Sequence, residues 1–224
     1  MRKRNGFRLP FLLPRSVRFI GLLWLGVVVL SEKPFDDLSA SDGRHDWVLN
    51  QDYSGSHPDT FERLRTEVPI LMRQTLIDLS VQLGLPFNEG WRYPLVVHFA
   101  DGAPPGIENA LAYVLLSGQG GEFRQDLFIN VAAYEREKYN FEKVLAHELV
   151  HAMVNDVVGA KATLVLPLWF HEGLAVYGAD QGEQMVRAYV QRVSQQSHRV
   201  LFNGLDGPHG ALDYAEDYLA IKYI

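Results

Sequence analysis

The residues best suited to chemistry in this 224-residue chain lie in the sequence His147-Glu148-Leu-Val-His151. Histidines four positions apart stand one turn above each other on the same face of a helix, so both rings can reach one ion. Glu148 lies about 100° around the helix axis from His147, where it can touch a water molecule on that ion without being a ligand. Because zinc lowers the pKa of a bound water to about 7, the pattern predicts a zinc site with Glu148 as the base.

A third protein ligand is expected, because catalytic zinc takes three and leaves the fourth position for water or substrate. The candidate is Glu172, in the sequence Leu166-Pro-Leu-Trp-Phe-His-Glu172-Gly. Twenty residues separate it from His151, enough for a helix end, a loop and a returning helix. The neighbouring His171 would point away from an ion that Glu172 faces. The predicted ligands are therefore His147, His151 and Glu172.

These two segments resemble the gluzincin metallopeptidases, the group that includes thermolysin and aminopeptidase N. The Trp-Phe-x-Glu-Gly-x-Ala pattern at residues 169–175 is most similar to the small peptidase-MA-like members. The resemblance implies a zincin-like domain in which a glutamate from a second helix completes the site, and an activity of zinc-dependent peptide-bond hydrolysis on a peptide or protein substrate. The metzincin pattern fits less well, because residues 152–158 supply neither its glycine nor its third histidine.

The resemblance also implies two further roles. A tyrosine at the start of a helix after the third ligand would donate to the developing oxyanion, and Tyr214 is the candidate, with Tyr218 and His209 as alternatives. A strand upstream of the active-site helix would pair with the extended substrate backbone, and its candidate residues are Ala112, Tyr113 and Val114. Asn155 and Asp156 could orient a histidine, or could simply be polar residues of the last helical turn.

A different class of function is a catalytically silent protein that keeps the zinc site as a scaffold or for recognition. A degraded site would be its signature, and Glu148 is intact. The absence of cysteine excludes thiol catalysis and disulfides.

Around these residues the sequence predicts an α+β domain of the zincin-like type, with a mostly antiparallel sheet followed by the active-site helix and C-terminal helices. Helical spacing of apolar residues begins at Asp59 and ends at Gly84. The expected strands are 93–99, 110–116 and 126–131, the last two paired through a loop longer than the tightest hairpin. The expected later helices are 140–158, one after Pro167, 181–196 and one from about residue 212.

The first 30 residues carry six basic side chains and no acidic one, and they include the apolar run 19–30. This predicts a signal peptide or an N-terminal membrane anchor over residues 1–31, a linker over 32–58 and the metallopeptidase domain over 59–224. Either alternative would export the domain, to the periplasm or the cell exterior, free or attached to the membrane. The remaining residues hold 15 basic and 27 acidic side chains, which argues against nucleic acid as a partner.

Overall fold

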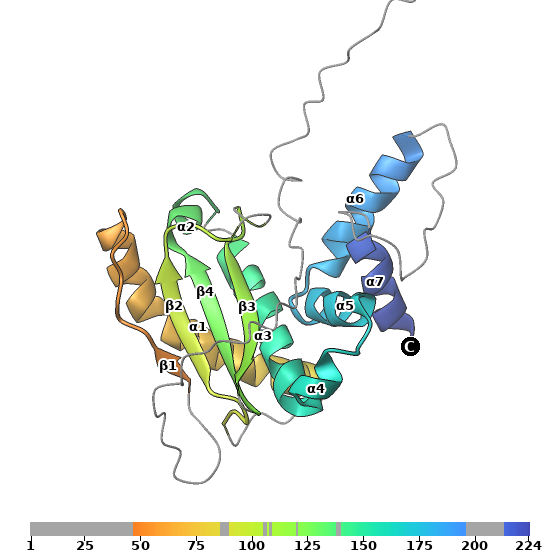
Figure 1. Cartoon of the computed structure of the whole chain (residues 1–224). Coiled ribbons are helices and arrows are strands. Elements are labelled where there is room, and N and C mark those ends of the chain that lie inside the picture. The colour runs from red at the N-terminus through yellow and green to blue at the C-terminus, as the bar shows by residue number, and fades with distance from the viewer. Residues whose placement is uncertain are drawn as a thin grey trace, which may run out of the picture.

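The computed structural model describes residues 47–85, 90–104, 107, 109–119, 121–137, 140–195 and 213–224. The strands are β1 (Val48–Leu49), β2 (Leu95–Ala100), β3 (Ala112–Gln119) and β4 (Glu122–Asn130). The helices are α1 (Pro58–Leu83), α2 (Val131–Glu137), α3 (Phe141–Val158), α4 (Ala160–Thr163), α5 (Leu168–Gly178), α6 (Gly182–Gln195) and α7 (Asp213–Tyr223). One sheet of four strands packs against α1 and α3, and α5, α6 and α7 form a helical layer beyond α3 (Figure 1). The α+β class is confirmed.

The sheet is mixed, so the predicted mostly antiparallel sheet is wrong. Its strand order is β1-β2-β4-β3, in which β1–β2 and β2–β4 are parallel pairs and β3–β4 is antiparallel. β1 and β2 can pair in parallel because α1, which lies between them in the sequence, provides the long crossover connection that a parallel pair needs. The predicted pairing of the β3–β4 hairpin is confirmed, but its turn is short, because Gln119 already pairs with Glu122.

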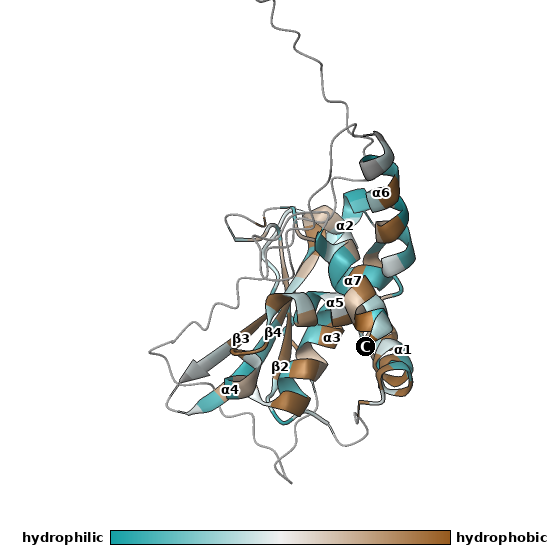
Figure 2. Cartoon of the chain, turned by 90° about the vertical axis from the view of Figure 1, so that its right-hand side faces the viewer, coloured by the Kyte–Doolittle hydropathy of each residue, from teal (hydrophilic) through white to brown (hydrophobic). Residues whose placement is uncertain are grey.

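The core lies between the sheet and the two helices behind it. Alternate residues of β2 are buried, as a strand with one covered face requires, and they meet a stripe of apolar α1 residues spaced three or four apart. This stripe consists of Leu64, Val68, Met72, Leu76 and Leu79. The strands and α3 carry the largest apolar stretches, whereas α6 alternates between polar and apolar residues (Figure 2). The position of α3 is thus set by its packing against the sheet and α1.

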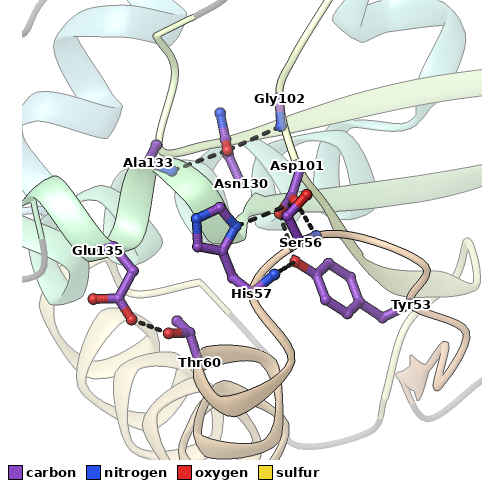
Figure 3. A network of polar contacts seen from close by, with 9 residues as sticks. All are labelled: Tyr53, Ser56, His57, Thr60, Asp101, Gly102, Asn130, Ala133 and Glu135. Atoms are coloured by element: carbon purple, nitrogen blue, oxygen red, sulfur yellow. Dashed lines mark hydrogen bonds and ion pairs between the residues drawn. The ribbon is translucent and has the colours of Figure 1, made fainter.

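The folded part begins upstream of the predicted boundary at residue 59. β1 pairs with β2, and the segment after it is tied to the turn that follows β2 through Asp101 (Figure 3). Tyr53 Oη donates to Asp101 Oδ1 at 2.6 Å, while the Ser56 amide and His57 Nδ1 lie 2.5 and 3.2 Å from Oδ2. Residues 47–57, assigned to the linker by the sequence analysis, are therefore joined to the sheet.

The predicted signal peptide or membrane anchor and the first part of the predicted linker, residues 1–46, lie outside the described residues. Within the described ranges, no helix is both long enough and apolar enough to cross a membrane.

A second, smaller apolar cluster joins α5, α6 and α7, and it contains Val176, Met185, Tyr214, Ala215 and Tyr218. The contact between α5 and α7 is close because Gly173 has no side chain. A methyl group there would lie 2.7 Å from Ile221 Cγ1 and 2.8 Å from the carbonyl carbon of Asp217, well inside normal contact distance. The glycine after Glu172 therefore allows α7 to pack beside the helix that carries this glutamate.

Candidate metal centre

The two histidines and Glu148 lie on the part of α3 that is buried on every side, residues 147–156. Helix α3 runs between the sheet, α1 and α5 (Figure 1), and a stretch without a solvent face is typical of such a central position. His147, Glu148 and His151 are exposed by only 5%, 2% and 2%. Burying three ionisable groups in an apolar setting is costly unless they have specific partners.

The structure brings the three predicted ligands together. Nε2 of His147 lies 3.4 Å from one carboxylate oxygen of Glu172, and Nε2 of His151 lies 3.7 Å from the other. The two imidazole rings, one turn apart on α3, have centroids 4.9 Å apart and planes inclined at 79°. One ligand atom from each residue lies within 4.8 Å of the others. His147, His151 and Glu172 thus form a buried group that could hold a metal ion.

The Glu172 carboxylate supplies an independent test of that fit. Glu172 is 1% exposed, and neither of its oxygens has a hydrogen-bond donor among the described residues. A buried carboxylate without donors is expensive, because burial removes its water without a replacement. A divalent cation among two imidazole nitrogens and this carboxylate would supply the missing charge. Two nitrogens and one oxygen are also a donor set that zinc accepts, with a fourth position open.

The charges in the site shift its histidines in opposite directions. Burial alone would lower the pKa of His147, but the facing carboxylate of Glu172 and the nearby Glu148 outweigh it, so the pKa is raised. Burial holds the pKa of His151 well below its usual value, and the neighbouring His147 and His171 rings add to this. His151 is therefore neutral in the metal-free chain, which is the form that binds a metal.

Glu148 lies against the edge of the sheet. The Val114 amide of β3 donates to Glu148 Oε2 at 3.0 Å. Burial raises the pKa of Glu148 to about 8, although His147 and the Val114 amide oppose the rise. A raised pKa is a property expected of a group that must accept and then release a proton near neutrality. Glu148 belongs to the same buried site as the ligands but is not part of the metal-binding group.

The hairpin register explains why that amide is available. The Asn130 amide donates to the Leu111 carbonyl at 2.9 Å, so residues 111, 113 and 115 are hydrogen-bonded to β4 and residues 112, 114 and 116 are not. The backbone groups of Ala112 and Val114 therefore face away from β4, at the free edge of the described sheet. Those of Tyr113 face Phe128 of β4, and its ring stacks on Phe128 with centroids 4.9 Å apart. Of the three predicted substrate residues, two thus present backbone groups at the edge.

Tyr214 is the first buried residue of α7, at 3% exposure. Burial raises the pKa of its hydroxyl, and the charges of Glu172 and Glu148 raise it further. The Tyr214 hydroxyl is therefore close enough to both carboxylates for their charges to act on it. Of the alternative donors, Tyr218 donates to Glu183 on α6 at 3.3 Å, and His209 lies outside the described residues.

Three other polar residues near the motif contact backbone or sheet groups. His171 Nε2 lies 3.3 Å from the Thr163 carbonyl, and His171 is not in the metal-binding group, as expected. Asn155 donates to Gln125 of β4 at 3.0 Å. Asp156 accepts from the Tyr93 amide at 3.1 Å and also from the Arg92 amide. Asn155 thus joins the last turn of α3 to β4, and Asp156 joins it to the residues that precede β2.

One residue of the site was missed by the sequence analysis. Gln181 Oε1, in the turn between α5 and α6, lies 3.2 Å from His147 Nδ1. No motif marks this glutamine, because the contact spans 34 residues of sequence and depends on the path of the turn.

Searches against protein-family models, curated proteins and solved structures found no match for the chain.

Proposed function

We propose that this chain is a zinc metallopeptidase of the gluzincin type that hydrolyses peptide bonds. The observation that carries the proposal is the buried Glu172 carboxylate, which faces Nε2 of His147 and of His151 and finds no hydrogen-bond donor within the described part of the chain, with Glu148 beside them at a sheet edge. His147, His151 and Glu172 would hold the ion. When bound, zinc supplies a Lewis acid that lowers the pKa of water to about 7 and polarises a carbonyl oxygen.

Each remaining step is assigned to a group of the chain. The carboxylate of Glu148 takes a proton from the attacking water and passes it to the leaving amine nitrogen. The hydroxyl of Tyr214 donates a hydrogen bond to the oxyanion that develops on the scissile carbonyl. The edge of β3 pairs with the extended backbone of the substrate through Ala112 and the Val114 carbonyl, since the Val114 amide contacts Glu148.

The first experiment separates metal binding from hydrolysis. Purified protein is expected to hold one equivalent of zinc and to cut members of a broad peptide library, and a chelator is expected to abolish the cutting. Glu148→Gln keeps the three ligands, so it should retain zinc and lose hydrolysis. Cleavage by this variant at the wild-type rate would refute the assigned mechanism. One equivalent of zinc in a wild-type protein that cuts no library peptide would instead support the silent zinc-binding scaffold.

We also propose that the domain acts outside the cytoplasmic membrane. The support is the N-terminal sequence, where six basic residues precede the apolar run 19–30. Cell fractionation of the full-length chain, with mass spectrometry of its N-terminus, would distinguish a cleaved signal from a retained anchor. Recovery of the intact chain from the cytosol would refute export.

A further inference from the structure

The turn between α5 and α6 is fastened to α3 at two consecutive residues. Gln181 Oε1 contacts Nδ1 of His147, and Lys143 Nζ donates to the Asp180 carbonyl at 2.6 Å and lies 3.4 Å from its carboxylate. Lys143 precedes His147 by four positions, so both attachment points lie on the same face of α3. A segment from the outer helical layer is thereby held against the face that carries a predicted metal ligand.

The backbone of this turn fixes the direction in which Gln181 leaves it. The Asp180 amide donates to the Tyr177 carbonyl at 3.2 Å and the Gln181 amide donates to the Val176 carbonyl at 3.1 Å. This is the Schellman arrangement that ends many helices, with its left-handed position taken by Asp180 at φ 51°. Asp180 is the only non-glycine residue with positive φ in the described ranges. Asp is one of the few residues with a side chain that adopt this left-handed conformation, and Lys143 contacts both its carbonyl and its carboxylate.

The contact from Gln181 selects one form of the His147 ring. An amide oxygen can only accept, so it takes a hydrogen from Nδ1, and in the neutral ring, the form that binds a metal, the lone pair is then on Nε2. Nε2 is the atom that faces Glu172, at 3.4 Å. Gln181 also has an ordinary structural role as the residue before α6, because its carbonyl accepts from the Met185 amide at 3.2 Å. That role gives no reason for its side chain to turn toward a buried imidazole.

We propose that Gln181 is a positioning residue for His147, and that Lys143 and Asp180 hold Gln181 in place. The inference rests on the proposed function, since it assigns Gln181 the task of keeping Nε2 of His147 ready for the metal. Groups in this position orient a ligating histidine, and their loss typically weakens metal affinity 10- to 100-fold. Here the orienting group is the neutral amide of Gln181, which lies in a turn. The orientation of His147 therefore depends on the geometry of the turn between α5 and α6.

The test compares zinc affinity, measured by competition with a chelator, across four variants of the full chain. Gln181→Met keeps the length of the side chain without its acceptor, and it should bind zinc 10- to 100-fold more weakly than the wild type. Gln181→Glu restores the acceptor and should return affinity to within a few-fold of wild type. Gln184→Met is the matched control, because Gln184 is exposed on the next turn of α6, and it should change nothing. Lys143→Met should weaken binding in the same direction as Gln181→Met.

A spectroscopic measurement accompanies the affinities. Cobalt(II) in place of zinc should give an altered visible spectrum in Gln181→Met and a normal one in Gln181→Glu and Gln184→Met. If wild-type protein binds one equivalent of zinc and Gln181→Met matches it in affinity and spectrum, the positioning role is refuted while the proposed function stands. Equal weakening by Gln181→Met, Gln181→Glu and Gln184→Met, with equal losses of folding stability, would also refute it. A wild-type protein that binds no zinc would refute the proposed function itself, and this inference with it.

Discussion

Replacing Gly173 by alanine should destabilise the protein, although the same change stabilises most helices. In an ordinary helix interior the substitution gains about 1 kcal/mol, because glycine is a poor helix former. Gly173 lies inside α5, yet an added methyl group would meet Ile221 Cγ1 at 2.7 Å and the Asp217 carbonyl carbon at 2.8 Å. Carbon atoms pack best at about 3.5–4.0 Å, so α5 and α7 would have to separate by roughly 1 Å.

Whether Gly173→Ala lowers or raises the stability depends on whether the atoms around the added methyl group can move. The Ile221 side chain can rotate away, but the carbonyl of Asp217 belongs to the α7 backbone and cannot. Overpacking of this kind costs up to about 3 kcal/mol, which exceeds the gain in helix propensity. The expected net loss is therefore about 2 kcal/mol, equivalent to a fall in Tm of roughly 4–8 °C for a chain of this size.

Urea unfolding followed by far-ultraviolet circular dichroism would measure this loss as a lower midpoint at unchanged slope. Adding Ile221→Ala to Gly173→Ala should recover only part of it, since the clash with the backbone remains. Because α7 carries Tyr214, the substitution should also lower turnover while zinc stays bound. A Gly173→Ala protein as stable as the wild type would show that the α5–α7 contact is not as close as described.

Three further predictions address the remaining parts of the site and the sheet. Tyr214→Phe should cut turnover about 10²-fold or more with zinc content unchanged, and near-normal turnover would remove Tyr214 from the mechanism. Val114→Pro removes the amide that contacts Glu148 and should lower turnover about 10-fold or more. It should also cost less stability than Leu115→Pro, which breaks a bond to β4 and should unfold the protein; equal urea midpoints for the two would contradict the register. The third prediction concerns Asp101. Burial alone would raise the pKa of its carboxyl, but the hydrogen bonds from Tyr53, Ser56 and His57 lower it. Its stabilising contribution is therefore present above the usual carboxyl pKa and lost as the pH falls through the lowered value. The amides of residues 47–57 should accordingly lose hydrogen-exchange protection, relative to intrinsic exchange at each pH, as the solution is made acid, and in Asp101→Asn the protection should be low at all pH values.

The long elements of the fold could be predicted because each one repeats a local pattern. Apolar spacing located α1 and α3 to within a residue or two, and Gly84 ends α1 in the left-handed conformation expected of it. Two short elements, α2 and α4, escaped notice, since seven and four residues hold too few repeats to define a period. The two-residue β1 was missed for the same reason.

The parallel pairing could not be predicted from the strands that were recognised. A helix followed by three strands fits either arrangement, and only β1 shows that α1 is a crossover within one sheet. The clustering of His147, His151 and Glu172, in contrast, could be predicted, because the spacing of the two histidines is local and Glu172 lies in a distinctive segment. Gln181 was missed because its role depends on the turn at Asp180, where a residue with a side chain adopts a conformation that usually signals glycine.

The contact between Glu148 and the free edge of β3 has a consequence for self-association. An open strand edge can recruit the same edge of another molecule, and proteins limit this hazard by placing charge or blocking groups along it. The Val114 amide is already occupied by a buried carboxylate, which interrupts the row of outward-facing donors between residues 112 and 116. A second copy of the strand would have to displace that carboxylate to pair along this stretch. The residue proposed to move protons during hydrolysis therefore also leaves one backbone donor fewer for another strand to pair with at this edge.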